Sequence, residues 1–172
     1  NTNEKDFVNR MLNEYNRFWN NDRTKKAKNL GLTRTEVSIL ASIVEMETYK
    51  KDERPTIARL YLNRLEKRMR LQSDPTVIYA IGDFSIKRVL TRDLKFESPY
   101  NTYINKGLPP GPICFPSINS IDAVLNASDN NYLFMCAKED FSGYHNFAST
   151  SKEHNKNAKK YRRALNKLKI MR

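Results

Sequence analysis

A short apolar run that ends in two glutamates constrains this chain more than any other feature. The run closes at Glu45, and Glu47 follows two positions later. Thr33 and Glu36 precede the run in the pattern of a capping box, in which each side chain binds a free backbone N–H at a helix start. We therefore predict a helix over residues 34–49 that is buried along one face and too short to cross a membrane.

Glu45 and Glu47 flank the apolar stripe of this predicted helix. The stripe consists of Val37, Leu40, Ala41 and Val44. At about 100° per residue, the two glutamates fall on its opposite sides. A carboxyl at the edge of apolar surroundings loses hydration, which raises its pKa toward the range that a general acid needs. The pattern favours a catalytic acid, but periodicity leaves open which glutamate acts and whether either is only ion-paired.

The composition describes a basic globular chain. Of the 172 residues, 39% are hydrophobic and 29% are charged, which suits one domain with a core. The formal net charge of +12 predicts attraction to a polyanion: nucleic acid, anionic lipid or an acidic cell-wall polymer. Nine tyrosines beside this charge keep a nucleic-acid-binding module open as an alternative. The chain has no helix-turn-helix, zinc-finger or aromatic RNA-binding signature to support that alternative.

The two cysteines do not suggest a metal site. Zinc in proteins usually takes four ligands, and the two histidines lie away from Cys114 and Cys136. Free cysteine is among the most buried residue types, so we favour buried free thiols over a disulfide.

The remaining patterns predict an α+β fold in which helices dominate and a small antiparallel sheet is added. Residues 5–20 have helical apolar spacing, which favours a helix packed on the core, with a membrane-lying helix as the alternative. Residues 20–28 are polar and basic, which is typical of a loop or a frayed helix end. Pro55 fits the first turn of another helix, whose basic face is expected to include Arg64.

The second half of the chain alternates loops with short elements. Residues 76–81 fit either a strand or a helix, and the three prolines of residues 107–112 predict a stiff loop. Residues 120–127 suggest a short helix. Residues 131–137 and 144–148 have strand composition and are expected to form a hairpin. A second capping box, Thr150 to Glu153, opens a basic C-terminal helix that is expected to be solvated or to contact an anionic surface.

Five motifs occur together in a fixed order. They are Leu40–Glu45, Asn63–Leu65, Met69–Tyr79, Tyr100–Tyr103 and Gly107–Ile113. With these motifs the chain resembles the YceG-like family, the MltG-type endolytic murein transglycosylases, from about Phe7 to Leu168. Met46 departs from the pattern, since lysine is expected after the first glutamate.

The resemblance implies a bacterial lytic transglycosylase that cuts peptidoglycan glycan strands between N-acetylmuramic acid (MurNAc) and N-acetylglucosamine (GlcNAc). Such an enzyme leaves 1,6-anhydroMurNAc ends without adding water, needs no metal or organic cofactor, and terminates or trims nascent strands. Its expected place is the periplasmic or extracytoplasmic face of the inner membrane, with peptidoglycan synthases as candidate partners and no specific nucleic acid. A non-catalytic cell-wall-binding module is the alternative.

The resemblance also implies a domain division and a set of site residues. Residues 1–30 are expected to be a helix and linker packed on the core, and residues 31–172 the catalytic domain, with a membrane anchor outside this chain. The family's acid falls on Glu45, which would act as general acid and base. The predicted substrate-binding residues are Glu47, Gln72, Asp74, Asn101, Thr102, Tyr103, Leu108, Pro109 and His145.

Several of these residues have a structural alternative. Glu47 could pair with a nearby cation or tune the acid, and Asp74 could cap the segment after it. Asn101 and Thr102 could satisfy their own backbone as turn residues. His145 could be a structural histidine on its strand.

Overall fold

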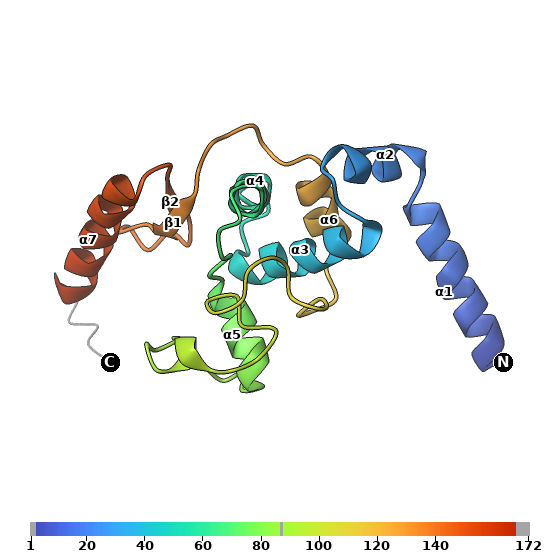
Figure 1. The fold of residues 1–172 in the computed structure, drawn as a ribbon, viewed down its shortest axis with the longest axis horizontal. Helices are drawn as coiled ribbons and strands as arrows, with labels where there is room; N and C mark the ends of the chain where they lie inside the picture. Colours follow the sequence, from blue (N-terminus) through green and yellow to red (C-terminus); the bar gives the residue numbers. More distant parts are fainter. Residues whose placement is uncertain (1–2, 87, 168–172) are drawn as a thin grey trace.

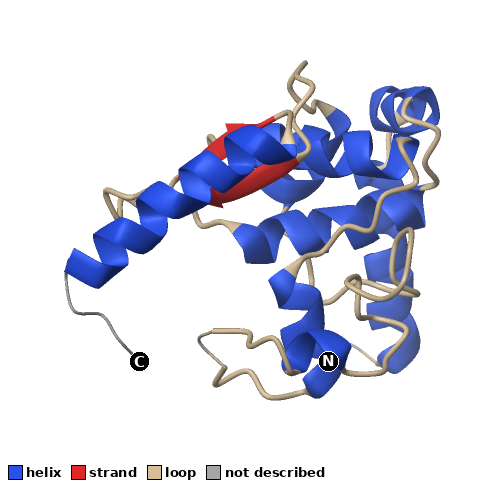
Figure 2. Ribbon diagram, turned by 60° about the vertical axis from the view of Figure 1, so that its left-hand side comes forward, coloured by secondary structure: helices blue, strands red, loops and turns tan. Residues whose placement is uncertain are grey.

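The computed structural model of this chain describes residues 3–86 and 88–167. In these residues, seven α-helices and one two-stranded antiparallel sheet form an α+β fold dominated by helices (Figures 1 and 2). The helices are α1 (Glu4–Phe18), α2 (Asn21–Asn29), α3 (Arg34–Glu47), α4 (Arg54–Glu66), α5 (Asp74–Ile81), α6 (Ile118–Leu125) and α7 (Ser151–Lys167), with a 3-10 turn at Asp93–Lys95. The strands are β1 (Phe134–Ala137) and β2 (His145–Ala148).

Helix α3 is the centre of the molecule. Its predicted capping box is confirmed: the Thr33 hydroxyl accepts from the Glu36 N–H at 3.2 Å, and the Glu36 carboxylate accepts from the Thr33 N–H at 2.8 Å. The predicted apolar stripe is buried, and so are Ile39, Ser42 and Ile43 on other faces. Burial on all sides follows from the helices that pack around α3, chiefly α4 and α6 with α5 below them (Figure 1). The helix ends at Glu47, slightly earlier than expected.

The β-hairpin and α7 form a lobe at one end of the body (Figure 1). The strands pair antiparallel with Phe134 opposite Ala148, and α7 packs on both. Three hydrogen bonds join the start of the hairpin to α4: Asn63 Nδ2 donates to two backbone carbonyls at 3.0 Å each, and Arg64 Nε donates to the Leu133 carbonyl at 2.6 Å. These bonds fix the hairpin as a wall beside α4.

Arg64 does not lie on a solvated basic face, contrary to the sequence-based expectation. The residue is only 7% exposed, and its guanidinium also donates to the carbonyls of Arg70 and Leu71 at 3.0 and 2.9 Å. A buried cation requires such partners because desolvation without compensation is unfavourable.

The N-terminal segment differs most from the expectation. Helix α1 has no buried residues and extends from the end of the body opposite the hairpin and α7 (Figure 1). Its apolar face is therefore not packed on the core. The core contacts begin at Phe18, the last residue of α1, and continue with the buried Trp19 and Ala27. Residues 20–28 are not a loop but helix α2, because the Asn20 side chain accepts from the Arg23 N–H at 2.9 Å and caps it.

Other expectations are confirmed in outline. Residues 76–81 belong to helix α5, so the strand alternative is wrong, and Gly82 ends the helix with φ of +78°. Residues 107–112 form an irregular loop, and both strands appear within the expected ranges but are shorter. None of the helices in residues 3–86 and 88–167 is both long enough and apolar enough to cross a membrane.

Replacing Asn63 with alanine should loosen the hairpin. The change leaves the carbonyls of Asn130 and Tyr132 without their donor, which should lower the free energy of unfolding by about 1–3 kcal/mol. Amide hydrogen exchange in β1 and β2 should become faster. The control Asn13→Ala, on the exposed surface of α1, should change the unfolding free energy by less than about 0.5 kcal/mol. Unchanged exchange in both strands would show that other contacts hold the hairpin.

Candidate active site

The two carboxylates in the last turn of α3, Glu45 and Glu47, point to different sides of the molecule. Glu45 faces the start of α4 and the start of α6. Its Oε1 accepts from Arg54 Nη2 at 2.8 Å, and its Oε2 accepts from the Ser120 hydroxyl at 2.5 Å and from the Ser117 N–H at 3.2 Å. The Ser117 hydroxyl also donates to Oε2. Both oxygens of Glu45 are therefore occupied by protein donors.

These contacts hold the pKa of Glu45 below its ordinary value. Partial burial alone would raise the pKa, but the hydrogen bonds from Ser117 and Ser120 and the charge of Arg54 together outweigh it. The raised pKa expected from the sequence is therefore wrong for Glu45. The apolar run predicts the loss of hydration but carries no information about donors that arrive from α4 and α6.

Glu47 has the opposite electrostatic character. Its Oε1 accepts from the Tyr61 hydroxyl at 2.6 Å and from the Ser73 hydroxyl at 2.5 Å. No side chain or backbone N–H in the described part of the chain donates to Oε2. Burial raises the pKa of Glu47 above its ordinary value and exceeds the opposing effect of the two hydroxyls, with the charge of Asp74 adding to the increase.

Glu47 lines a polar cavity of about 200 Å³ between the helical body and the hairpin. The lining side chains come from α3, α4, the segment before α5 and the first residue of α5, the loop that contains Tyr103, and both strands. They are Glu47, Leu60, Tyr61, Arg64, Leu71, Gln72, Asp74, Tyr103, Met135, Cys136, Ala137 and His145. The structure thus brings together five of the predicted site residues: Glu47, Gln72, Asp74, Tyr103 and His145.

Gln72 is held in an uncommon backbone conformation at the edge of this cavity. Its φ is +54°, a region that residues other than glycine rarely occupy. Its N–H donates to the Thr102 carbonyl at 3.1 Å, and Arg64 Nη1 donates to its side-chain oxygen at 3.1 Å. Because Arg64 takes the amide oxygen, the amide nitrogen of Gln72 remains as a donor.

Asn101 and Thr102 form a buried framework behind the cavity. Asn101 is 0% exposed; its Nδ2 donates to the carbonyls of Leu94 and Phe96, and its Oδ1 accepts from the Tyr103 N–H at 2.9 Å. Thr102 Oγ1 accepts from the Ser73 N–H at 3.0 Å. Their predicted contact with substrate is not supported, since both side chains are enclosed. The alternative, side chains that satisfy the local backbone, describes them.

Hydrogen bonds to carboxylates orient the side chains of Tyr103 and His145. The Tyr103 hydroxyl donates to Asp74 Oδ1 at 2.5 Å, and His145 Nδ1 lies 2.8 Å from Glu53 Oε2. Burial first, and then Asp74, raise the pKa of Tyr103 far above its ordinary value, so the hydroxyl stays protonated and acts as a donor.

Leu108 and Pro109 do not line the cavity. Leu108 packs against the hydrophobic core and Pro109 is buried. The proline-rich loop therefore supports the body rather than the cavity wall. Sequence reasoning also missed seven lining residues: Leu60, Tyr61, Arg64, Leu71, Met135, Cys136 and Ala137. Of these seven, Arg64 and Leu71 had a usable indication, because each lies inside one of the five motifs.

The two cysteines are free thiols, as favoured from the sequence, but they are half-buried rather than enclosed. Cys136 lines the cavity and burial raises its pKa, so it stays protonated. Within residues 3–86 and 88–167, no group of three or more His, Cys, Asp or Glu side chains could hold a metal ion.

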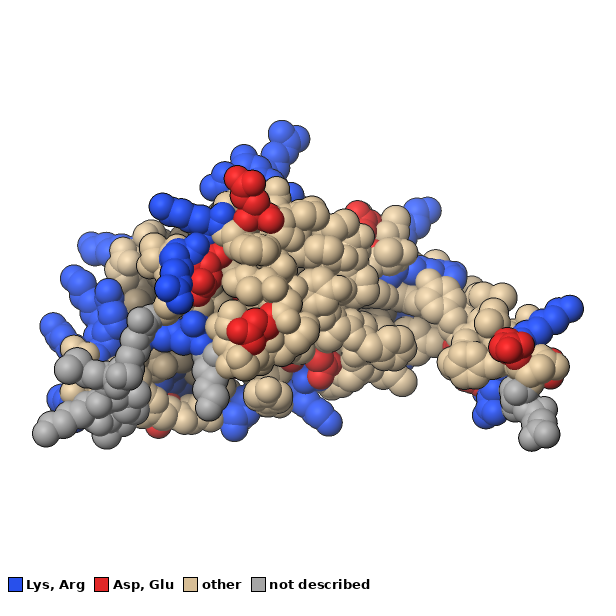
Figure 3. All heavy atoms as spheres, turned by 90° about the horizontal axis from the view of Figure 1, so that it is seen from below, with Lys and Arg blue, Asp and Glu red and all other residues tan. Residues whose placement is uncertain are grey.

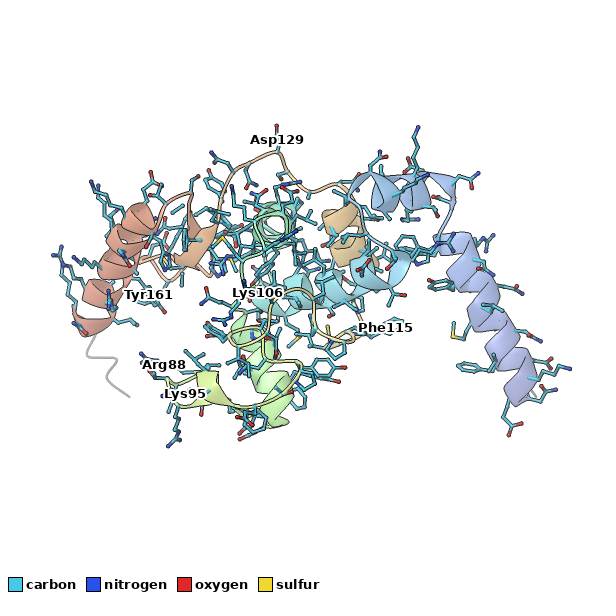
Figure 4. The ribbon with its side chains drawn as sticks, in the orientation of Figure 1. Arg88, Lys95, Lys106, Phe115, Asp129 and Tyr161 are labelled. Carbon is cyan, nitrogen blue, oxygen red and sulfur yellow. The ribbon has the colours of Figure 1, made fainter. Side chains whose placement is uncertain are left out.

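A larger groove of about 890 Å³ lies between α1 and residues 112–116, and it is a poor candidate for polar chemistry. Its lining is almost entirely apolar, with Glu14 as the one charged residue from the described chain. Phe115, labelled in Figure 4, is fully exposed there. A carbohydrate needs several polar partners, so the smaller cavity at Glu47 is the candidate active site.

The chain is similar to known cell-wall proteins. The model of the YceG-like family matches residues 1–160. The endolytic murein transglycosylase of Bacillus subtilis strain 168 is 39% identical over 160 residues, covering 93% of this chain and 43% of that protein. The protein of the same name from Streptococcus pneumoniae serotype 2 is 36% identical over 138 residues, covering 78% of this chain and 24% of that protein.

A solved structure has the same fold. The 2.6 Å crystal structure of a yceG-like protein from Listeria monocytogenes matches with a TM-score of 0.71 and 39% identity. The match covers 77% of this chain and 42% of that one. This chain therefore spans less than half the length of the relatives that it matches.

The variants Glu47→Gln and Glu45→Gln should change stability with opposite pH dependence. Because folding raises the pKa of Glu47, ionising it opposes folding, and this loss grows as the pH rises above the ordinary value of 4.5. Glu47→Gln removes the loss, so its stability relative to the native chain should be greater at about pH 8 than at about pH 4.

Glu45 should behave in the reverse way. Its lowered pKa means that the carboxylate stabilises the fold above 4.5 and that this contribution disappears as the pH falls through the folded-state pKa. Glu45→Gln should therefore lose stability at neutral pH and approach the native chain in acid. Urea unfolding across this range measures both variants, and parallel pH curves would contradict the assignment of the two environments.

Proposed function

This chain belongs to the YceG-like family, and we propose that it is a lytic transglycosylase that cleaves peptidoglycan glycan strands between MurNAc and GlcNAc. The observation that carries the proposal is the Glu47 carboxyl, which has a raised pKa and one unoccupied oxygen in an open polar cavity. A raised pKa favours the protonated carboxyl, the form that can give a proton to a leaving group.

We propose Glu47 as the general acid in place of Glu45. A general acid needs a proton and an oxygen that substrate can reach. Glu45 lacks both, because Arg54 and two serines occupy its oxygens and stabilise its charged form. In Glu47, burial favours the protonated form and Oε2 receives no hydrogen bond from the described residues. The hydroxyls of Tyr61 and Ser73 fix the orientation of its carboxyl plane. Glu45 then acts as a structural anchor for the end of α3.

The proposed reaction has two steps and consumes no water. In the first, Glu47 gives its proton to the GlcNAc oxygen as the bond from that oxygen to C1 of MurNAc breaks. The acetamido oxygen of MurNAc bonds to C1 and carries the developing positive charge, as in substrate-assisted glycosidases. In the second, the 6-hydroxyl oxygen bonds to C1, the acetamido oxygen leaves, and the hydroxyl proton passes to the Glu47 carboxylate.

The other cavity residues are suited to hold a sugar. The free amide nitrogen of Gln72 can donate to a sugar oxygen because Arg64 has fixed the opposite end of the amide. His145 adds an imidazole that Glu53 orients, and Met135 and Leu60 supply apolar surface for a ring face. This chemistry calls for no metal or organic cofactor.

We further propose that the chain works at the extracytoplasmic face of the bacterial membrane as the catalytic domain of a longer, membrane-anchored protein. The division at residues 30 and 31 stays a prediction, as do partner synthases. Helix α7 supports attachment to an anionic wall or membrane surface, since seven of its side chains are basic: Lys152, Lys156, Lys159, Lys160, Arg162, Arg163 and Lys167. Basic side chains gather over that end of the molecule in Figure 3.

Replacing Glu47 with glutamine should abolish cleavage of purified glycan strands. An amide keeps the hydrogen bonds near the site but cannot give and retrieve a proton, so the rate should fall by about 10²–10⁴. Glu45→Gln is the matched control two residues away, and a folded sample should lose much less activity. Product release followed by chromatography, with circular dichroism to check folding, measures both. If Glu47→Gln keeps full activity and a folded Glu45→Gln is inactive, Glu45 and not Glu47 is the general acid.

The products should carry 1,6-anhydro ends even in water. A 6-hydroxyl on the same sugar has an effective concentration of about 10⁵ M or more when aligned, which exceeds that of any solvent water. Cleavage in oxygen-18 water followed by mass spectrometry should give unlabelled products that are lighter by one water than hydrolysed ends. Labelled reducing ends would identify a hydrolase, and intact strands that remain bound to the protein would identify a wall-binding module.

A further inference from the structure

Asp74 is a second carboxylate of the cavity, and the proposed acid–base steps do not use it. It is the first residue of α5 and is exposed, whereas Glu47 lies deeper between α3 and α4. Both residues line the same cavity. Substrate bound in this cavity at Glu47 therefore also lies close to the Asp74 carboxylate.

The position of Asp74 is fixed by a chain of contacts that ends in the core. Its Oδ1 accepts from the Tyr103 hydroxyl at 2.5 Å. The Tyr103 N–H in turn donates to Oδ1 of the fully buried Asn101 at 2.9 Å. The residue before Asp74 is fixed in the same way, because the Ser73 N–H donates to Thr102 Oγ1 at 3.0 Å. An exposed carboxylate that only capped a helix would not need this support.

The second oxygen of Asp74 is an available acceptor. Tyr103 binds Oδ1, and no hydrogen bond from the described residues reaches Oδ2. Two donors that line the cavity bind other groups: Arg64 binds carbonyls and Gln72, and Tyr61 binds Glu47. Asp74 Oδ2 is thus a fixed carboxylate acceptor with no donor among the described residues.

We propose that Asp74 accepts a hydrogen bond from the acetamido N–H of MurNAc and so stabilises the charged intermediate of the reaction. The inference rests on the proposed transglycosylase function. When the acetamido oxygen bonds to C1, positive charge spreads over the oxygen, carbon and nitrogen of the amide, and its N–H becomes a stronger donor. Asp74 stays a carboxylate throughout and takes no proton, so Glu47 remains the only group that exchanges one. Tyr103 is a positioning residue that fixes the carboxylate plane.

In this proposal the two carboxylates have different roles: Glu47 exchanges the proton, and Asp74 supplies a fixed charge. The charge of Asp74 contributes to the raised pKa of Glu47 and so favours the protonated acid before cleavage. The same charge stabilises the cationic amide after the bond to GlcNAc breaks. A charged acceptor that is already oriented acts mainly in the transition state, because the neutral acetamido group of the bound strand gains little from it.

The test measures kcat and KM of Asp74→Asn on purified glycan strands. We expect kcat to fall by about 10²-fold, the usual size of such a stabilising contact, while KM changes by less than about threefold. Tyr103→Phe should lower kcat by about tenfold, since Asp74 stays but is less well oriented. The control is Asp129→Asn. Asp129, labelled in Figure 4, is exposed and does not line the cavity, so this variant should match the native chain.

Two further readouts separate this role from a structural one. The alkaline limb of the kcat/KM profile should move to lower pH in Asp74→Asn, because the variant lacks the charge that helps to hold the proton on Glu47. On strands whose muramic acetamido groups have been removed, the native chain should be slow. Asp74→Asn should then be within about threefold of it, since the two changes remove the same interaction.

The outcomes distinguish the inference from the function on which it rests. A folded Asp74→Asn that keeps kcat within about threefold of the native chain, or that changes only KM, overturns the role of Asp74. In that case an inactive Glu47→Gln still leaves the transglycosylase proposal intact. A native chain that cleaves no strands, or that gives labelled reducing ends in oxygen-18 water, overturns both.

Discussion

Arg54 is a buried cation at the start of α4, and the arrangement of the site depends on how it is neutralised. The residue is 4% exposed and forms an ion pair with Glu45, reinforced by contacts to Ser117 and Asn119. A buried cation without a partner is strongly destabilising, so Glu45 must face Arg54. Because α3 is a regular helix, this also fixes the direction of Glu47, two residues and about 200° further around. The ion pair of Glu45 with Arg54 therefore orients the end of α3 so that Glu47 faces the cavity.

The cavity itself is assembled from two parts of the fold that Arg64 joins. Its guanidinium binds the carbonyl of Leu133 at the entry to the hairpin and three acceptors in the segment that leads to α5. The hairpin supplies one wall and the segment with Gln72 and Asp74 another. The buried Asn101 and Thr102 support that second wall from behind. Most of the polar residues in the five motifs thus build the site without touching its open space.

The sequence predicted the helix at α3 well, because a capping box and a buried stripe are local features. It also predicted the α+β class, the hairpin and Glu47 among the residues of the cavity, but it placed Glu45 there as well. It could not rank these glutamates, since their difference lies in donors from α4, α6 and Ser73, which are distant in sequence. The same limit explains Asn101 and Thr102, whose polar side chains suggested substrate contact until their burial was known. The same limit applies to α1. Its apolar spacing correctly predicts a helix, but spacing alone carries no information about which surface the apolar face packs against.

The most direct test of this account is a carbon-13 NMR titration of the side-chain carboxyl groups in the native chain, with Glu45→Gln and Glu47→Gln used to assign the two resonances. The account predicts that Glu47 titrates above the ordinary glutamate value of 4.5 and Glu45 below it. It also predicts that Asp74→Asn lowers the pKa of Glu47. A Glu45 that titrates above Glu47 would contradict the account, because the proton needed for cleavage would then lie on the residue bound to Arg54.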